Sequence, residues 1–316
     1  MSDWINKDTY QTIKQASTNM VKPNETIWIN NEDKEPGQSS TITNINLGRS
    51  PHKIMICTPV HSDVSMHYCQ AVLKMQQECM RRNMLVSFTI MKSSLVTQGR
   101  NLCVAEFLNH EDQYTHLLFI DSDIDFKFST IEKMLEADKD IISCPYPMKQ
   151  FSWDKAWRRL TQKDGAITDG NDLAKAGYTF PIKLDKKEQI IVDKGLIEAT
   201  HAPTGCMLIK RKVITDLIKA HPELEIFQPT NMNGKEVKKE NFYNLFDTLH
   251  EPETKRYFGE DFGFCERWRK LGGKVYLYVT DYISHIGEYQ YCGRFLDDLK
   301  QGTAPLKSVD DSKKIK

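Results

Sequence analysis

Three short apolar runs alternate with two longer amphipathic segments before residue 121, and this order restricts the fold more than any other feature. The apolar runs are HKIMICTPV (52–60), MLVSFTIM (84–91) and YTHLLFI (114–120), and the segments between them are MHYCQAVLKMQQECMRR (66–82) and NLCVAEFLNH (101–110). Short apolar runs bounded by polar residues are typical of buried strands, and apolar residues on one helical face are typical of amphipathic helices. Strands alternating with helices predict a parallel sheet with crossover helices.

Further elements are expected after residue 120. STIEKMLEA (129–137) predicts a helix, with Ser129 as N-cap and Glu132 completing a capping box. The other expected elements are strands at 140–144, 205–210 and 274–279, the last of the chain, and helices at 211–221 and 260–272, the second ended by Gly272-Gly273. Residues 149–195 and 222–256 are polar and are expected to be irregular surface segments. We therefore predict an α/β fold in which helices flank a Rossmann-like mixed sheet.

Composition restricts the class of protein. Hydrophobic residues make up 40% of the 316 residues and charged residues 27%, which is enough for a sizeable core. The 43 basic and 43 acidic residues cancel, so the net charge favours neither nucleic acid nor an anionic membrane. No apolar run approaches the ~18 residues of a transmembrane segment, and MSDWINKDTYQ does not resemble a signal peptide. The eight cysteines form no C-x-x-C pair, which favours free thiols in a reducing cytoplasm over disulfides or a zinc site.

Three carboxylates follow the strand at 114–120. In LLFIDSDIDF the aspartates occupy alternate positions 121, 123 and 125, so in an extended chain their side chains share one side. Ligands bind at the carboxyl ends of strands in open α/β sheets. Clustered carboxylates stay ionised only beside a cation, and oxygen ligands together with a diphosphate select Mg²⁺ or Mn²⁺. The motif therefore predicts a metal that bridges the protein and a diphosphate.

Other interpretations of these aspartates are weaker or remain open. They could instead cap a loop and the helix after it. An EF-hand is disfavoured because Phe126 stands where its loop needs glycine and because a strand precedes the motif. A phosphatase of the haloacid dehalogenase type is disfavoured because two strands come first and Asp125 stands where Thr or Val is expected.

Five segments, in order, resemble the glycosyltransferases of the GT-A fold that use nucleotide-sugar donors. The likeness covers residues 52–295 and is closest to the family 2-like and Anp1-like members, including virus-encoded ones. Besides Asp121-Ser122-Asp123, which resembles the family's D-x-D motif, the segments are TPVHSD, QGRNLCVAEFL, APTGCMLIKRKV, YFGEDFGFCERWRKLGGKVYL and SHIGEYQYCG. The resemblance implies a single GT-A catalytic domain at 51–295, between a polar N-terminal extension (1–50) and a polar C-terminal tail (296–316).

The resemblance also implies roles for individual residues. Asp121, Asp123 and His285 would hold Mn²⁺ or Mg²⁺, Asp261 would be the general base of an inverting transfer, and Glu260 would assist it. Donor contacts would come from Thr58, Pro59, Arg100, Asn101, Asp121, Ser122 and Asp123. Acceptor contacts would come from Thr204 and Gly205. Trp153, just past the fourth strand, is a further acceptor candidate because sugars stack on aromatic rings.

Each role has a structural alternative. Glu260 and Asp261 could be ordinary acidic residues of a first helical turn, His285 a hydrogen-bonded loop histidine, Arg100 a surface charge and Trp153 a packing residue. Two rival functions are a sugar nucleotidyltransferase and a non-catalytic glycan- or nucleotide-binding module. The first usually has a glycine-rich loop after its first strand, which TPVHSD lacks, and the second would not need all four of Asp121, Asp123, Asp261 and His285.

The expected donor is a nucleotide-diphosphate sugar. The acceptor could be a glycan, a protein, a lipid-linked sugar or a modified DNA base. We expect a cytoplasmic enzyme, or one in the host cytoplasm for a virus-encoded member.

Overall fold

The computed structural model describes residues 50–162, 167–185, 189–227, 229–232, 235–302 and 306–309. The expected N-terminal extension, 1–50, therefore lies outside the described residues except for Ser50. The described residues belong to one compact unit, Leu47–Lys316. Among them, no helix is long and apolar enough to cross a membrane.

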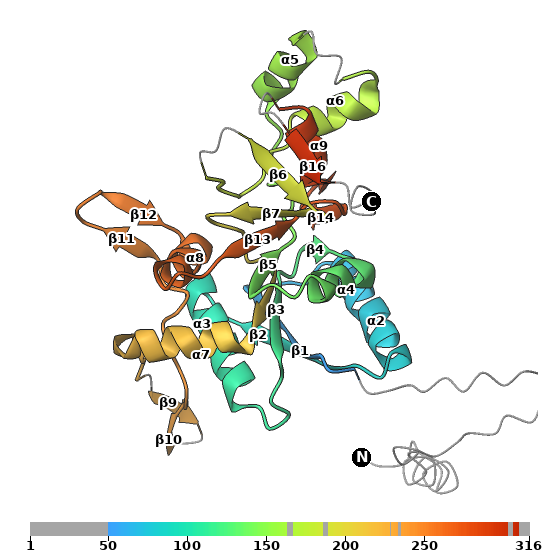
Figure 1. The fold of residues 1–316 in the computed structure, drawn as a ribbon. Coiled ribbons are helices and arrows are strands. Elements are labelled where there is room, and N and C mark those ends of the chain that lie inside the picture. The colour runs from blue at the N-terminus through green and yellow to red at the C-terminus, as the bar shows by residue number, and fades with distance from the viewer. Residues whose placement is uncertain are drawn as a thin grey trace, which may run out of the picture. The chain divides into compact units, whose positions relative to one another are not determined.

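One large mixed sheet organises this unit (Figure 1). Its described strands, in spatial order, are β16 (Leu306–Val309), β6 (Ile190–Asp193), β7 (Leu196–Ala199), β13 (Val275–Tyr278), β5 (Ile141–Ser143), β8 (Cys206–Lys210), β3 (His116–Ile120), β1 (Lys53–Val60) and β2 (Leu85–Lys92). The pairs β1–β2 and β1–β3 are parallel, as the alternation in the sequence predicts, and so is β5–β13. β8 runs antiparallel to both β3 and β5, which makes the sheet mixed. The predicted α/β class with a Rossmann-like mixed sheet is confirmed.

Helices cover both faces of the sheet. The described helices are α2 (Met66–Arg81), α3 (Val96–Asn109), α4 (Phe128–Glu136), α5 (Trp153–Thr161), α6 (Gly170–Ala176), α7 (Arg211–Ala220), α8 (Glu260–Lys270) and α9 (Phe295–Lys300), with a short 3₁₀ helix, η1 (Pro222–Leu224). Side chains alternate across β1 and β3 because a strand has a period of two residues. Ile54 and Leu118 pack with α2 and α4 on one face, whereas Met55 and Leu117 belong to the core with α3, α7 and α8 on the other.

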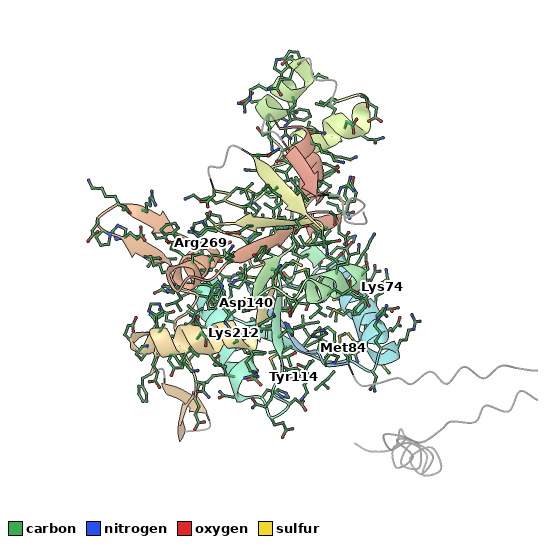
Figure 2. All side chains as sticks on the ribbon, in the orientation of Figure 1. Lys74, Met84, Tyr114, Asp140, Lys212 and Arg269 are labelled. Carbon is green, nitrogen blue, oxygen red and sulfur yellow. The ribbon has the colours of Figure 1, made fainter. Side chains whose placement is uncertain are left out.

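Smaller sheets surround the main one. They are β4 (Ile124–Asp125) with β14 (Ile283–Ile286) and β15 (Gln290–Gly293), β9 (Pro229–Met232) with β10 (Lys235–Lys238), and β11 (Leu249–Glu251) with β12 (Arg256–Phe258). Figure 2 shows how densely side chains fill the space between sheet and helices. At the opposite end of β5 from the strand-end aspartates, Lys212 of α7 lies 3.7 Å from Asp140.

Four details of the sequence prediction are wrong. Ser129 lies inside α4, whose N-cap is Lys127, because the buried Phe128 already belongs to the helix. Glu132 therefore caps nothing and instead accepts a hydrogen bond from Arg82 at 2.9 Å. The two segments expected to be irregular contain regular elements: 149–195 contains α5, α6 and β6, and 222–256 contains η1, β9, β10 and β11. The strand at 275–278 is not the last, since β14, β15 and β16 follow it.

The expected C-terminal tail, 296–316, also takes part in the fold where the structure describes it. Phe295 and Leu299 of α9 are buried in the core, and β16 pairs in parallel with β6. The eight cysteines are all free and six of them are buried, as their spacing predicts.

The strand directions place several segments at one edge of the sheet. β1, β3 and β5 point the same way, so the last residues of β1, Thr58 to Val60, lie toward the same edge as Asp121 and Tyr146, which follow β3 and β5. The antiparallel β8 begins at that edge, which brings Gly205 beside Asp121: the Asp121 backbone N–H donates to the Gly205 carbonyl at 3.0 Å.

Candidate active site

The candidate site is built on the turn Asp121-Ser122-Asp123, which joins the buried strand β3 to β4. Three segments hold this turn through backbone hydrogen bonds. Besides the bond to Gly205, the Ser122 carbonyl accepts from Ser65 at 2.8 Å, and the Asp123 carbonyl accepts from Ile286 at 2.7 Å. The two carboxylates are thus displayed by a backbone fixed to the start of α2, to the start of β8 and to the end of β14.

Asp121 forms an ion pair with a buried arginine. Nη2 of Arg100 lies 3.0 Å from Oδ1 and 3.2 Å from Oδ2 of Asp121, and its Nε lies 3.8 Å from Oε1 of Glu260. The Arg100 side chain is only 3% exposed, so the alternative of a surface charge is wrong. Burial disfavours the charged guanidinium, yet the carboxylates of Asp121 and Glu260 outweigh that effect and raise the pKa of Arg100. Arg100 therefore joins the end of β3 to the start of α8.

Part of the Arg100 guanidinium has no hydrogen-bond partner among the described residues. Its Nε and Nη1 atoms are buried and lack an acceptor. A buried unpaired donor normally costs about 1–3 kcal/mol, so it is usually retained for a ligand or an ordered water. The predicted donor contact of Arg100 stays a prediction, and these two donors are the atoms that could make it.

Asp123 has different partners. Its Oδ2 lies 2.6 Å from Nζ of Lys149 and 3.5 Å from Nε2 of His285. Burial alone would raise the pKa of Asp123. The neighbouring His285 and Lys149 outweigh burial and hold this pKa below its ordinary value. The local backbone conformation explains why Asp121 and Asp123 have different partners. They occupy a turn and not an extended strand, so the expected alternation of side chains does not apply.

His285 is oriented by the backbone. Its Nδ1 lies 3.0 Å from the carbonyl oxygen of Pro147, which can only accept, so Nδ1 carries the hydrogen. In the neutral ring, Nε2 then presents a lone pair toward Asp123, and that is the usual arrangement of a metal-binding histidine. His285 has a specific neighbour in Asp123, although its predicted role as a ligand is not tested by this geometry alone.

The three predicted metal ligands are not brought together. Asp123 and His285 are neighbours, whereas Asp121 is paired with Arg100. Within the part of the chain that the structure describes, no group of three His, Cys, Asp or Glu side chains forms a metal site. The lone pair of His285 and the carboxylate of Asp123 nonetheless fit a hard divalent cation, which often takes one or two protein ligands and completes its coordination with substrate phosphates and water.

Glu260 and Asp261 begin α8, after the N-cap Gly259. Oδ1 of Asp261 accepts a hydrogen bond from the backbone N–H of Phe262 at 2.8 Å. Burial, followed by the negative charge of Glu260, raises the pKa of Asp261 to about 6. A carboxylate whose pKa lies this close to neutral can accept a proton from a hydroxyl group more effectively than an ordinary aspartate can.

Three predicted site residues have structural contacts. The Thr58 hydroxyl is buried 2.5 Å from the hydroxyl of Tyr68. The Asn101 side chain is buried, donating to Oδ1 of Asn244 at 2.8 Å and accepting from the backbone of Phe246 at 2.9 Å. Thr204 is buried as well. The side chains of Thr58 and Asn101 have partners within the protein, and ligand contacts for all three residues remain predictions.

The other predicted residues lie differently. Pro59 is partly buried at the end of β1. Gly205 is required sterically, because a Cβ there would lie 2.4 Å from the hydroxyl oxygen of Tyr146. Trp153 is 74% exposed at the start of α5, so the alternative of core packing is wrong for its indole.

Two residues at this edge escaped the sequence interpretation. Lys149 binds Asp123, and Tyr146 lies edge-on to the His285 ring with 5.0 Å between centroids. Burial, together with the charge of Asp121, raises the pKa of Tyr146 well above its ordinary value, so its hydroxyl stays protonated. Both follow β5, whose carboxyl end lies at the same edge as that of β3. Strand direction is the signal that could have identified them.

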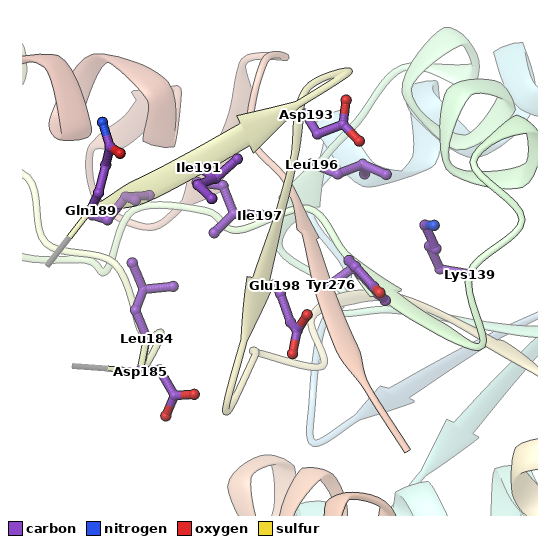
Figure 3. A pocket seen from close by; sticks show the side chains of 11 residues that line it. Lys139, Leu184, Asp185, Gln189, Ile191, Asp193, Leu196, Ile197, Glu198 and Tyr276 are labelled. Atoms are coloured by element: carbon purple, nitrogen blue, oxygen red, sulfur yellow. The ribbon is translucent and has the colours of Figure 1, made fainter. Parts of the chain in front are cut away.

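A cavity elsewhere in the fold is separate from this edge (Figure 3). It has a volume of about 280 Å³ and lies beside β6, β7 and β13, with Ile191, Glu198 and Tyr276 among its lining residues. None of the predicted site residues belongs to its lining.

Comparisons with known proteins identify no family. No protein-family model matches the chain, and no curated protein matches its sequence. Among solved structures, A197 from STIV is 13% identical with a TM-score of 0.38, covering 74% of this chain and 86% of its own. A 4-diphosphocytidyl-2C-methyl-D-erythritol synthase from Anaerococcus prevotii is 10% identical with a TM-score of 0.29, covering 69% and 99%. A glycosyltransferase involved in the glycosylation of the major capsid of PBCV-1 is 9% identical with a TM-score of 0.22, covering 54% and 68%. These values are too low to assign a reaction.

Proposed function

We propose that this protein is a metal-dependent glycosyltransferase of the GT-A type, which transfers a sugar from a nucleotide-diphosphate donor to a hydroxyl acceptor with Asp261 as general base. One observation carries the proposal. Arg100 links Asp121, at the end of β3, to Glu260, at the start of α8, so two acidic segments about 140 residues apart share one edge of the sheet. Stabilisation of the leaving group and removal of the acceptor proton both need carboxylates. The edge has one set of carboxylates after β3 and another at the start of α8.

The Asp123 side of the site suits the departing diphosphate. Asp123 and His285 would hold Mn²⁺ or Mg²⁺, which would neutralise charge on the diphosphate as a Lewis acid. Lys149, now 2.6 Å from Asp123, would give up this contact to the cation and could then bind a phosphate oxygen. The Nε and Nη1 atoms of Arg100, which have no hydrogen-bond acceptor among the described residues, would add hydrogen-bond donors near the same leaving group.

The Asp261 side suits the acceptor. Its carboxylate would take the proton of the attacking hydroxyl, and Glu260, which shares Arg100 with Asp121, would hold the start of α8 in place. With a pKa of about 6, Asp261 is mostly ionised at pH 7 and is therefore ready to act as a base. Attack on the face opposite the diphosphate would give an inverting transfer.

Donor binding with and without metal tests the proposal. Thermal shift with UDP-, GDP-, CDP-, ADP- and dTDP-sugars, each with Mn²⁺ or with EDTA, should identify a donor that stabilises the protein only when Mn²⁺ is present. Asp123→Asn should abolish that stabilisation, and His285→Ala should weaken it only in Mn²⁺. Asp125→Asn is the matched control because Asp125, two residues on in β4, has no ion pair with a described residue within 4 Å. Equal stabilisation in EDTA, or by the Asp123→Asn variant, would disprove the metal role.

A further inference from the structure

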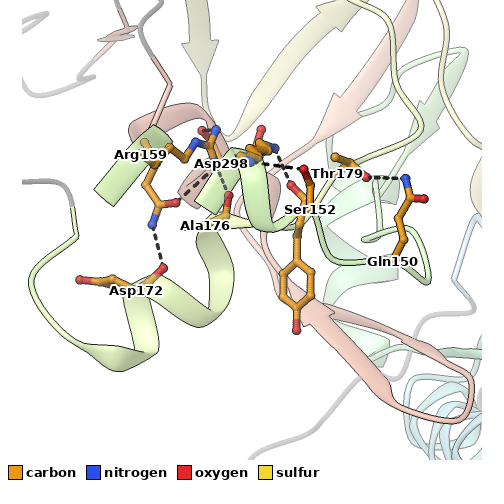
Figure 4. Close-up of polar contacts among 10 residues, drawn as sticks. Gln150, Ser152, Arg159, Asp172, Ala176, Thr179 and Asp298 are labelled. Carbon is orange, nitrogen blue, oxygen red and sulfur yellow. Dashed lines mark hydrogen bonds and ion pairs between the residues drawn. The ribbon is translucent and has the colours of Figure 1, made fainter. Parts of the chain in front are cut away.

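Helix α5 is held to the fold by its charged side. Nζ of Lys155 lies 2.6 Å from Oδ1 of Asp298 in α9, and Nη1 of Arg159 lies 3.0 Å from the same oxygen. Arg159 also donates to the carbonyls of Ala176 at 3.0 Å and of Asp298 at 2.9 Å, as Figure 4 shows. The side chains of Lys155 and Arg159 are only 21% and 10% exposed.

The apolar side of α5 faces solvent. Trp153, Trp157 and Leu160 are 74%, 66% and 44% exposed and follow one another at i, i+4 and i+7, the spacing of a single helical stripe. A surface helix normally turns such a stripe toward the core and its charges toward water. Here the arrangement is reversed. An exposed apolar stripe of this kind usually marks a binding surface.

The stripe begins close to the candidate active site. Lys149, which binds Asp123, precedes Trp153 by four residues, so their Cα atoms can be at most about 15 Å apart. From Trp153 the stripe extends along the helix for about 10 Å to Leu160. A ligand on the stripe could therefore reach from the helix surface to the site.

A series of aromatic contacts connects the same two places. Phe151 packs edge-on against Trp153, with 4.6 Å between centroids, and against Tyr178, with 5.8 Å. Tyr178 contacts Tyr291, which contacts Tyr289, at 6.2 and 5.1 Å. Tyr289 is 61% exposed in the hairpin that follows His285. Exposed aromatic rings thus stand at both ends of a packed aromatic row beside the site.

Size argues against a protein partner. Two exposed indoles of roughly 150–250 Å² each and part of a leucine provide a few hundred Å². A standard protein interface needs about 800 Å² from each partner. The stripe is one helix face wide, and the exposed polar side chains of Asp154 and Arg158 flank it. A narrow ligand with its own hydroxyl groups fits this surface better than a second protein.

Charge argues against an anionic membrane. Helices that lie on such membranes direct several Lys and Arg side chains toward the lipid headgroups. Of the three basic residues of α5, Lys155 and Arg159 are paired with Asp298 on the inner side. Only Arg158 remains exposed beside the stripe.

We propose that Trp153 and Trp157 form a binding surface for the sugar rings of an oligosaccharide acceptor, with Tyr289 as a further ring near the site. The inference rests on the proposed function and specifies the acceptor class as a carbohydrate chain. The apolar faces of sugar rings stack on the indoles, and Asp154 and Arg158 bind hydroxyl groups at the sides.

Oligosaccharide binding without a nucleotide sugar tests the inference separately from transfer. Calorimetry with gluco-, manno- and N-acetylglucosamine oligosaccharides of two to six units should find a series whose affinity rises with chain length. Trp153→Ala/Trp157→Ala should weaken that binding about tenfold or more, since each aromatic contact typically contributes up to tenfold. Tyr257→Ala is the matched control, because Tyr257 is 69% exposed in β12 and outside the stripe.

Each result has a defined meaning. If no oligosaccharide binds, or if binding is unchanged in the double variant, the inference is wrong. It is also wrong if the tryptophans instead mediate binding to vesicles of phosphatidylcholine with phosphatidylserine, or self-association in sedimentation experiments. A failure of the donor experiment with intact oligosaccharide binding would disprove the proposed function and leave the binding surface in place.

Discussion

At the scale of single residues, the position of Asp261 gives the most specific prediction about the mechanism. A general base acts on the acceptor hydroxyl and leaves donor binding alone. We expect Asp261→Asn to bind the donor as tightly as the unmodified protein while transfer falls by roughly 10²–10⁴-fold. Glu260→Gln should have a smaller effect, because Glu260 lies 3.8 Å from Arg100 and only helps to place α8. Single-turnover transfer, measured beside donor titration, separates the two steps.

A different result would change the mechanism. If Asp261→Asn transfers sugar at close to the normal rate, Asp261 is not the base. An inverting mechanism would then lose its main support, and a retaining mechanism would become the better explanation.

The pKa of Asp261 also predicts how stability depends on pH. An aspartate of pKa near 3.8 when unfolded and about 6 when folded binds its proton more tightly in the folded state. It therefore destabilises the fold as pH rises from about 4 to about 6, and the loss is complete above pH 6. Asp261→Asn removes this penalty. We expect the variant to be more stable by about 1–2 kcal/mol at pH 7.5, after allowance for partial exposure, and to gain almost nothing at pH 4. Denaturant titration at both pH values measures this, and an equal gain at both would contradict the assigned pKa.

The sequence predicted where the carboxylates of the strand end lie but not which side chains they pair with. Asp121 and Asp123 were placed correctly at the carboxyl end of β3, because a buried apolar strand followed by carboxylates is a local signal. Their partners Arg100, Lys149 and His285 come from three other segments, and no local pattern determines which carboxylate each one meets. Lys149 was missed altogether because a single lysine after a strand has no distinguishing neighbours in the sequence.

At the scale of elements, Asn101 joins α3 to the segment that precedes β11. Its amide meets Asn244 and the buried backbone N–H of Phe246, so Asn101→Ala would leave that N–H without an acceptor. We expect a loss of about 1–3 kcal/mol of unfolding free energy. Asn109→Ala is the control, since Asn109 lies at the exposed end of the same helix and donates to the Glu240 carbonyl. Chemical denaturation compares the two, and similar small losses for both would exclude an anchoring role for Asn101.

The elements that the sequence missed have physical reasons for being missed. In α5 the charged side is buried and the tryptophans are exposed. Helix prediction from periodicity expects the apolar side chains to point inward, so it does not recognise this helix. The strands β14, β15 and β16 have four residues each, and β6 has mixed burial, so their alternation is too short to separate from a loop. The strands β1, β2 and β3 were predicted correctly because apolar runs that form strands of five to eight residues, bounded by polar residues, are an informative local signal.

At the scale of the whole molecule, Asp298 ties the end of the described fold to its middle. It pairs with both Lys155 and Arg159, which are largely buried, and burial lowers the pKa of Lys155 despite this partner. Asp298→Asn should therefore destabilise the protein by about 1–3 kcal/mol, because two partly desolvated cations lose their charge partner. Asp138→Asn should cost far less, since Asp138 is 78% exposed beside Lys210. Thermal melts of both variants at low and high salt provide the comparison, and equal losses would mean that the Asp298 cluster adds no more than a surface ion pair.

The position of β13 has a consequence for how the protein is made. This strand lies between β5 and β7 inside the sheet, yet it is encoded about 130 residues after β5. At translation rates of about 5–20 residues per second, β5 waits several seconds or more on the ribosome for that neighbour. During this time the nascent chain exposes unpaired strand edges, which are sites of aggregation. The same late segment brings Glu260, Asp261 and His285. Synthesis of this protein should therefore depend on chaperones that protect the growing chain, and the proposed activity should appear only after this late segment has been made.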